Sequence, residues 1–374
     1  MSIMVARCYS SSSESVVALV PLRVVVVLGL LVVLVCGSSS QQCHEEDEAA
    51  LLALNAGLGS PYHFESWSPD TWCCDWYDVD CDNVTGRVVG LSVFQDSNLT
   101  AGAIPDAVAN LTHLRSLTLH HLPGLTGAIP ESLALLANLS VLTISYTGMS
   151  GPVPSFLSRL TSLTLLDLSY NSFTGAIPAS LADLPNLAGI NLSRNRLTGT
   201  IPHMLFSKLS SSSSSSDSEE QKQQQQQQGR IVSLWLSHNE LSGSIPAEFA
   251  AVNFAYVDLS RNAFTGDPSE AFFGAAARPS IQHLDLSRNR FAFSLTGAEL
   301  PEQLSFLDLS HNGIRGRIPE QLANLTNLKA FNVSYNKLCG QVPGGGIMSR
   351  FDAYSFQHNK CLCGAPLQAC PKMS

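Results

Sequence analysis

The chain has 374 residues, of which 14% are charged and 45% are hydrophobic, and its formal net charge is −9. So low a charged fraction excludes a coiled coil or a charged disordered tail, and the negative charge argues against a nucleic-acid partner. The length alone is typical of two or three ordinary domains. Leu, Ser, Asn and Gly recur at regular intervals, however, which indicates a repeated structural frame.

The N-terminal segment predicts a secretory signal peptide over residues 1–40. Twelve apolar residues, Val24–Val35, follow Arg23 and precede the small residues after Cys36. A basic flank, a short apolar stretch and small residues are typical of a cleaved signal, whereas a membrane-spanning helix needs about 20 apolar residues. We therefore expect a secreted chain that has no membrane segment once the signal is removed.

Eight cysteines remain after residue 40, and they lie in two groups of four near the two ends of the chain. An even count in a secreted chain favours disulfides over a metal site, but spacing alone leaves about a hundred pairings open. We predict disulfide-bonded caps over residues 41–90 and 339–374. The eight residues are Cys43, Cys73, Cys74, Cys81, Cys339, Cys361, Cys363 and Cys370.

Copies of one sequence unit fill residues 91–338 and recur about every 24 residues, the period of leucine-rich repeats. One unit cannot bury its leucines alone, so the units are expected to stack into a curved solenoid. We predict a single α/β solenoid: a right-handed leucine-rich repeat superhelix of about ten repeats with a parallel concave β-sheet, capped by disulfides at both ends. The units start at Leu91, Leu117, Leu142, Leu166, Ile190, Leu234, Val257, Leu284, Leu307 and Phe331.

The sequence of each unit predicts a strand, then a turn, and then a segment that runs back along the opposite side of the solenoid. Alternating leucines, as in Leu166-Asp-Leu168, indicate a short strand with one buried face. An Asn such as Asn171 follows where the strand turns, and its amide can bond backbone groups that the turn leaves unpaired. A Gly-x-Ile-Pro bend then leads into a helical or 3-10 turn. The Asn column comprises Asn171, Asn195, Asn239, Asn262, Asn289, Asn312 and Asn336.

One interval between units is 44 residues long, which indicates an insertion of about 20 residues over 209–228. The insertion consists of serines, an acidic patch and the glutamines Gln223–Gln228. Such a composition cannot bury apolar surface, so we predict that the insertion is disordered and leaves the back or edge of the solenoid.

The exposed positions of the predicted strands bring acidic, basic and aromatic residues onto one face. Aromatic residues and Arg are typical anchors of protein interfaces, and Trp235, Tyr170 and Phe306 are costly to expose without a use. The alternative is that Asp and Arg neutralise one another on a wetted surface. We favour a protein-binding face made of His121, Tyr146, Asp167, Tyr170, Arg194, Trp235, His238, Tyr256, Asp258, Arg261, His283, Asp285, Arg288, Phe306, Asp308 and His311.

Catalysis, a cofactor and a metal are not expected. Asp258, Asp285 and Asp308 stand on adjacent predicted strands about 5 Å apart, a spacing close to that of the two carboxylates of retaining glycosidases. They form an open ladder, however, and the chain lacks the hydrolase, metalloprotease and phosphate-loop motifs. His238 and His311 lie three repeats apart, roughly 14 Å, which is too far to share a metal.

The Gly-x-Ile-Pro form of the repeat is that of plant extracellular leucine-rich repeat proteins. Over nearly all of its length after residue 40, the chain further resembles the polygalacturonase-inhibiting proteins of plant cell walls. Its two ends and its irregular seventh and eighth repeats carry this resemblance. The matching stretches are Asp47–Leu52, Trp72–Trp76, Gly266–Ser269, Phe291–Phe293, Asn332–Pro343 and His358–Leu367.

The resemblance implies the disulfides Cys43–Cys73, Cys74–Cys81, Cys339–Cys361 and Cys363–Cys370. It also implies a function: inhibition of microbial (above all fungal) or insect endopolygalacturonases in plant defence, in the extracellular space or the cell wall. The concave sheet would dock on or near the substrate cleft of the enzyme. The alternative is a secreted interaction module that acts with receptors in plant development or signalling.

The net charge of this chain differs from that of most members of the family it resembles. Removal of residues 1–40 leaves 19 basic and 29 acidic residues, a formal charge of −10. Family members are commonly basic, which suits attachment to anionic pectin, so we expect at most a weak pectin contact here.

Seven Asn-x-Ser/Thr triplets follow the signal, and each is a potential glycosylation site in a secreted chain. Asn191 and Asn332 lie on the expected binding face, where a glycan would obstruct a partner, so we predict that these two are poorly occupied. Glycans are predicted at Asn83, Asn98, Asn110, Asn138 and Asn324.

Overall fold

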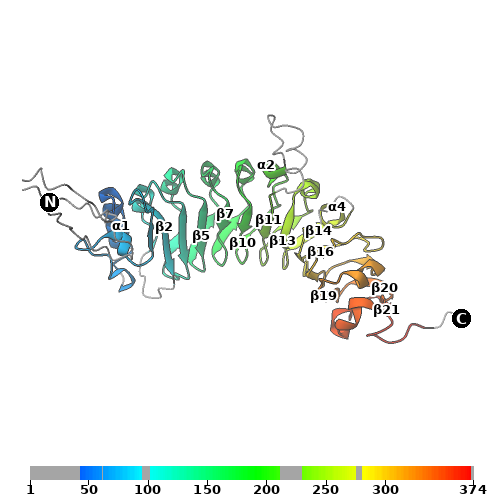
Figure 1. The fold of residues 1–374 in the computed structure, drawn as a ribbon. Coiled ribbons are helices and arrows are strands. Elements are labelled where there is room, and N and C mark those ends of the chain that lie inside the picture. The colour runs from blue at the N-terminus through cyan, green and yellow to red at the C-terminus, as the bar shows by residue number, and fades with distance from the viewer. Residues whose placement is uncertain (1–42, 61, 95–101, 211–229, 275–279, 372–374) are drawn as a thin grey trace, which may run out of the picture.

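The computed structural model describes residues 43–60, 62–94, 102–210, 230–274 and 280–371. The predicted signal peptide, Asn98 and nearly all of the predicted insertion lie outside these residues. The described chain forms one curved solenoid, with strands along one side and short helical turns along the other (Figure 1). No helix among the described residues is long and apolar enough to cross a membrane.

An eleven-stranded sheet runs the length of the solenoid in the order β1-β2-β3-β5-β7-β9-β11-β13-β15-β17-β19, and only β1 is antiparallel to its neighbour. Neighbouring repeats therefore contribute neighbouring strands. The strands are β1 (Val79–Cys81), β2 (Val88–Phe94), β3 (Ser116–His120), β5 (Val141–Ser145), β7 (Leu165–Asp167), β9 (Gly189–Asn191), β11 (Val232–Trp235), β13 (Phe254–Asp258), β15 (His283–Asp285), β17 (Phe306–Asp308) and β19 (Ala330–Asn332).

Strands of two to five residues that follow the turns form three further sheets along one flank. These strands coincide with the bends that the sequence marks with Gly. The first sheet contains β4 (Thr126–Gly127), β6 (Gly148–Pro152), β8 (Ser172–Gly175) and β10 (Arg196–Leu197). The second contains β12 (Ser242–Gly243), β14 (Ala263–Gly266) and β16 (Arg290–Phe291), and the third β18 (Arg315–Gly316), β20 (Lys337–Gln341) and β21 (Cys361–Cys363).

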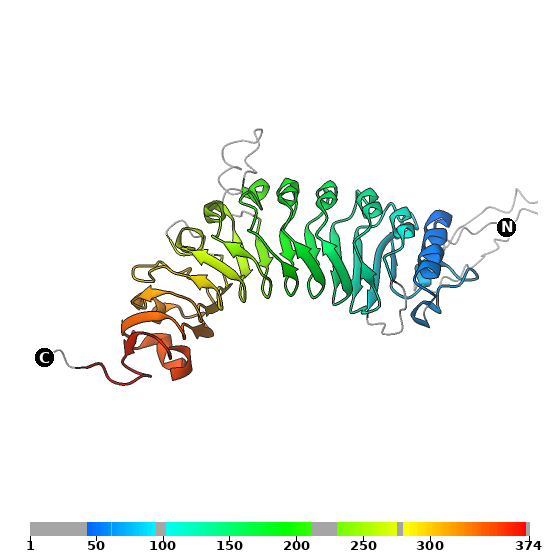
Figure 2. The same ribbon diagram turned by 180° about the vertical axis from the view of Figure 1, so that it is seen from behind.

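The convex side consists mainly of single 3-10 turns, most of which begin directly after a Pro whose fixed φ suits a helix start (Figure 2). These turns are η4 (Asp106–Asn110), η5 (Glu131–Leu135), η6 (Ser155–Arg159), η7 (Ala179–Asp183), η8 (Ala247–Ala251) and η9 (Glu320–Asn324). The short helices α2 (Ser207–Ser210) and α4 (Ser269–Phe272) replace them in two repeats.

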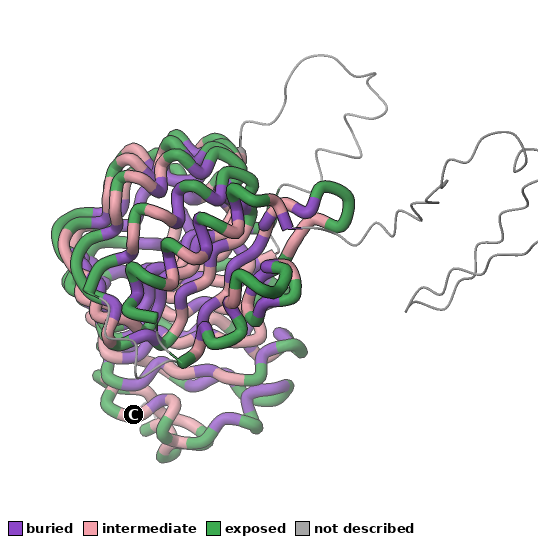
Figure 3. Tube along the Cα trace, turned by 90° about the vertical axis from the view of Figure 1, so that its left-hand side faces the viewer, coloured by how far each residue is buried: buried purple, intermediate pink, exposed green. Residues whose placement is uncertain are grey.

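The core is a continuous cluster of apolar side chains enclosed by the coil, and Figure 3 shows where buried residues lie along the chain. Leu166 and Leu168 are fully buried while Asp167 between them is partly exposed, so the alternation expected of a half-buried strand is confirmed. In the C-terminal half phenylalanines fill the core, and Phe254, Phe264 and Phe291 have no exposed surface.

The Asn column bonds the backbone in the way the sequence predicts. Asn195 donates from Nδ2 to the carbonyl oxygens of Leu168 and Leu192, at 2.9 and 3.1 Å, and its Oδ1 accepts the N–H of Phe173 at 2.9 Å. Each buried amide therefore ties its own turn to the preceding repeat. Asn359 repeats this pattern with Val333 and Leu338, so the ladder continues into the C-terminal cap.

Both ends are closed by the disulfide pairs that the resemblance implied: Cys43–Cys73, Cys74–Cys81, Cys339–Cys361 and Cys363–Cys370. The N-terminal cap contains α1 (Glu45–Gly57), η2 (Tyr62–Phe64) and η3 (Cys73–Asp75), and the C-terminal cap contains η10 (Gly346–Arg350) and η11 (Ala353–Ser355).

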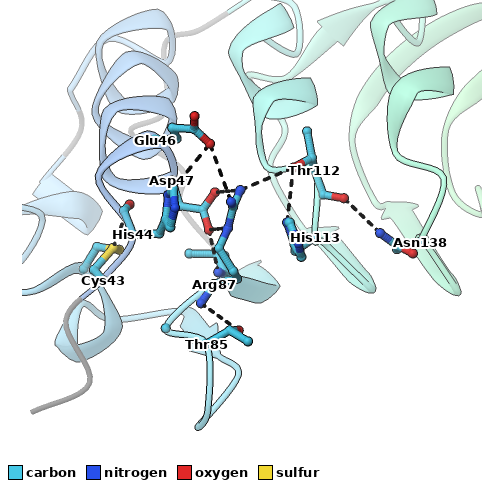
Figure 4. A network of polar contacts seen from close by, with 12 residues as sticks. Cys43, His44, Glu46, Asp47, Thr85, Arg87, Thr112, His113 and Asn138 are labelled. Atoms are coloured by element: carbon cyan, nitrogen blue, oxygen red, sulfur yellow. Dashed lines mark hydrogen bonds and ion pairs between the residues drawn. A yellow bond between two sulfur atoms is a disulfide. The ribbon is translucent and has the colours of Figure 1, made fainter. Parts of the chain in front are cut away.

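A buried ion pair locks the N-terminal cap to the sheet (Figure 4). Asp47 of α1 has no exposed surface and accepts two hydrogen bonds from the Arg87 guanidinium, at 2.8 and 2.9 Å. The N–H of Val88 donates to the same carboxylate at 2.8 Å. The carboxylate is thus fully paired, as a buried charge must be.

Candidate protein-binding face

The concave sheet carries two parallel columns of side chains, and the strand register sets their composition. In β13, β15 and β17, Tyr256, His283 and Phe306 are paired neighbours, and Asp258, Asp285 and Asp308 are paired neighbours two residues later. Residues two apart on a strand point to the same face. We call the first set the aromatic column and include Trp235 in it, because its ring packs against Tyr256 although its backbone is in register with Asp258. The second set is the carboxylate column, which continues at the same register through Asn332 on one side and through Asn191 and Asp167 on the other.

The aromatic column is a continuous stack of rings. The ring centroids of Tyr256 and His283 lie 3.9 Å apart and those of His283 and Phe306 lie 4.1 Å apart, with nearly parallel planes. Trp235 on β11 packs at a tilt against Tyr256 at 5.0 Å. Because the rings stack along the sheet, the column presents ring edges to a partner and is held rigid without one.

The carboxylate column caps the turns that follow its strands. Oδ1 of Asp258, Asp285 and Asp308 accepts the N–H of the Ser two residues further on, at 2.8–3.0 Å. Burial and, to a lesser degree, the charges of its two neighbours raise the pKa of Asp285 to about 6, against the lowering effect of its bonds from Ser287. The carboxylate column therefore stabilises the turns through its hydrogen bonds, and its ionised carboxylates repel one another.

A third set of residues lies beyond the strands, and all of them except Tyr335 and His358 belong to the predicted binding face. Each member has a left-handed backbone with φ of 54–58°, so its side chain projects from the turn. The prediction that these residues lie on the strands is in this respect wrong. We call this set the turn column; it contains no acidic residue. It comprises His121, Tyr146, Tyr170, Arg194, His238, Arg261, Arg288, His311, Tyr335 and His358.

Rings and cations in the turn column contact one another in sequence. Tyr146 and Tyr170 stack at 3.7 Å, and the Arg194 guanidinium lies 4.9 Å from the Tyr170 ring centroid, within reach of a cation–π contact. At the other end Tyr335 stacks between His311 and His358, at 4.1 Å from each. Partial burial, followed by the charge of nearby arginines, lowers the pKa of His311, and the same causes lower that of His238.

The alternative that Asp and Arg neutralise one another is not supported by direct ion pairs. Among the described residues, the salt bridges join other groups, and none reaches Asp258, Asp285 or Asp308. The carboxylate column and the turn column, which carries the arginines, are therefore separate rows on the surface.

Three residues of this surface escaped the sequence interpretation. Phe94 is 47% exposed and His120 lies 6.1 Å from it and 5.2 Å from Tyr146, so both extend the turn column's ring cluster toward the N-terminus. His358 extends it toward the C-terminus. Their repeats match the consensus poorly, but the His-Asn pair at 358–359 repeats the Arg-Asn and Tyr-Asn pairs of earlier units and could have been recognised.

Potential glycosylation sites differ in their surroundings. Asn83, Asn110, Asn138 and Asn324 are exposed. Asn191 and Asn332 are half-buried in the carboxylate column, where their Nδ2 atoms donate to Asp167 and Asp308 at 3.1 and 3.4 Å. Nδ2 of exposed Asn138 is also engaged, since it donates to the carbonyl oxygen of Thr112 at 3.1 Å. What sets Asn191 and Asn332 apart is therefore their partial burial within the binding face.

Comparisons with known proteins agree with this architecture. The "Leucine rich repeat N-terminal domain" family matches residues 44–82, and leucine-rich repeat families match residues 137–197, 230–252 and 303–325. The crystal structure of a plant ice-binding protein superimposes with a TM-score of 0.80 at 40% identity, and covers 89% of this chain and 100% of that one. The class is thus that of the plant leucine-rich repeat proteins.

Similar sequences narrow the class to a family. "Polygalacturonase inhibitor 1" of Arabidopsis thaliana is 48% identical over 89% of this chain and 94% of its own length. "Polygalacturonase inhibitor" of Vitis vinifera is 46% identical over 92% and 96%. "Leucine-rich repeat protein FLOR 1" of Arabidopsis thaliana is 45% identical over 89% and 94%. The chain belongs to the polygalacturonase inhibitor family.

Proposed function

We propose that this protein is a secreted inhibitor of microbial or insect endopolygalacturonases, that it works in plant defence, and that it binds the enzyme through its concave face. The observation that carries the proposal is that, on a chain of this family, a rigid aromatic column lies beside a carboxylate column that no salt bridge among the described residues neutralises. An enzyme that acts on a polyanion needs a cationic cleft, and a row of carboxylates complements such a cleft.

The turn column supports a further contact with pectin. It presents Arg194, Arg261 and Arg288 without any acidic residue, along a line with one position per strand, about 4.8 Å apart. The surplus of acidic residues elsewhere in the chain makes this contact weak. It should disappear at high salt, since exposed charges are screened.

Extracellular location and glycosylation complete the proposal. Glycans at the exposed sites Asn83, Asn110, Asn138 and Asn324 leave the concave columns accessible, while Asn191 and Asn332 stay unmodified. Three of the four, Asn110, Asn138 and Asn324, end or follow 3-10 turns on the convex side.

The test is an inhibition assay with purified protein against a panel of fungal and insect endopolygalacturonases, in which the release of reducing sugar is measured. We expect inhibition of at least one enzyme, and its loss in Trp235→Ala. Tyr62→Ala is the matched control, because Tyr62 is an 81% exposed aromatic residue in the N-terminal cap, away from the concave columns. Failure against the whole panel, with receptor ectodomains recovered in a pull-down, would favour the interaction-module alternative.

A further inference from the structure

Three acidic side chains stand on three adjacent strands, and no salt bridge within the described part of the chain reaches them. The register places Asp285 of β15 between Asp258 of β13 and Asp308 of β17, at the strand spacing of about 4.8 Å. The other titratable or charged groups around Asp285 are Tyr256 on β13, His283 on its own strand, and Arg261, Arg288 and His311 in the adjoining turns.

Elsewhere the same column joins its strands with amide donors. Asn191 donates to Oδ2 of Asp167, and Asn332 donates to Oδ2 of Asp308, across one strand step each. The steps from Asp258 to Asp285 and from Asp285 to Asp308 join one carboxylate to another. Two ionised carboxylates offer only acceptors, so neither can donate to the other across these steps unless one of them holds a proton.

We propose that Asp285 holds a proton in the free protein in mildly acidic solution, and that it releases this proton when a cationic partner surface docks on the carboxylate column. The inference rests on the proposed function, because the docking surface is the cleft of a polyanion-cleaving enzyme. It makes the affinity of the concave face depend on pH through one named residue.

The direction of the pH dependence follows from the surroundings of Asp285. Burial and two neighbouring carboxylates favour its neutral form, with a pKa of about 6 in the free protein. A Lys or Arg brought against the column by the partner favours the ionised form instead. A complex that binds fewer protons than its free components becomes tighter as the pH rises. The affinity should therefore rise by up to about fivefold between pH 5 and pH 6 and by a further factor of about two between pH 6 and pH 7, and level off above that.

The experiment is isothermal titration calorimetry with an inhibited polygalacturonase at pH 5, 6 and 7, each in two buffers of different ionisation enthalpy. Wild type is compared with Asp285→Asn, which mimics the neutral form and should fold, because Asn already occupies this column at Asn191 and Asn332. Asp183→Asn is the matched control, since Asp183 is exposed on the convex turn η7.

We expect wild type and Asp183→Asn to release up to one more proton per complex at pH 5 than Asp285→Asn, whose affinity should change less between pH 5 and pH 6. Equal proton release and equal pH profiles in all three proteins would overturn the inference. A carbon-13 titration of the aspartate carboxyls in the free protein should show one resonance with a midpoint near pH 6 that disappears in Asp285→Asn; its absence would also overturn the inference. Absence of binding at every pH would refute the proposed function instead, and the carbon-13 titration would still decide whether Asp285 holds the proton.

Discussion

The N-terminal cap should depend on the single carboxylate of Asp47. In Asp47→Asn the side chain keeps an oxygen for the N–H of Val88, but it can no longer pair both guanidinium nitrogens of Arg87. The Arg87 side chain is only 11% exposed, and its remaining acidic partner, Glu46, is 75% exposed at 3.5 Å. A buried cation is therefore left with a weak, solvated partner.

Breaking one side of a buried pair typically costs about 3–5 kcal/mol, because the remaining charge is desolvated without compensation. We expect the lower end of this range, about 3 kcal/mol, since Glu46 retains part of the pairing. Glu131→Gln is the matched control. It breaks the 3.0 Å pair between Glu131 and Arg159, but both side chains are at least 60% exposed, so the expected cost is below about 1 kcal/mol.

Urea unfolding followed by tryptophan fluorescence measures this cost locally. Trp67 and Trp76 are buried in the same cap and stack at 5.7 Å, and Trp72 lies there too, so most of the emission reports the cap. Trp235→Phe removes the remaining tryptophan, which lies on β11. A loss of less than 1 kcal/mol in Asp47→Asn, or a loss equal to that in Glu131→Gln, would refute the reasoning. The double variant with Arg87→Met should recover part of the loss, because no charge then stays buried.

Three further outcomes are expected. Trp235→Ala should weaken enzyme binding at least tenfold, or about 1.4 kcal/mol, in calorimetry, because it removes the end of the ring stack; an unchanged affinity would move the interface elsewhere. Asn289→Ala should lower the free energy of unfolding by about 2–3 kcal/mol in urea, because it orphans the N–H of Phe264 and the carbonyl oxygens that Asn289 bonds, and a loss below 1 kcal/mol would contradict this role. Glycopeptide mapping should find Asn191 and Asn332 unoccupied, and full occupancy would contradict a concave binding site.

The pH dependence of stability follows from the same carboxyl group as the pH dependence of binding. An acid whose pKa is higher in the folded state, about 6 for Asp285 against 3.8 for an exposed aspartate, binds its proton more tightly when folded. Its contribution is therefore most favourable below about pH 4 and is lost as the pH rises through 6. In wild type, thermal unfolding should show that the free energy of unfolding falls by about 2–3 kcal/mol between pH 4 and pH 7 through this group, and by less in Asp285→Asn. Parallel curves would show that Asp285 is not the group responsible.

Most of the fold could be predicted because the repeat is local and periodic. The spacing of Leu166 and Leu168 decides which side of the strand is buried, and the position of Asn195 decides where the turn is tied, whatever the neighbouring repeats contain. The site could be predicted only as a set of columns. The left-handed turn that carries Arg194 and its equivalents moves those side chains out of the strand, and no residue pattern in one unit reveals this.

By itself the sequence determined the solenoid, its two disulfide-bonded ends and the residue types on its concave side, since each of these follows from short-range spacing or from family motifs. Only the tertiary structure decided the pairing of Asp47 with Arg87, which lie 40 residues apart, the ring contacts of 3.9–4.1 Å in the aromatic column and the engaged amides of Asn191 and Asn332. These properties depend on the distance between successive turns and on what each turn shields from water. Packing of the whole coil sets both, and the same packing raises the pKa of Asp285 above that of an exposed aspartate.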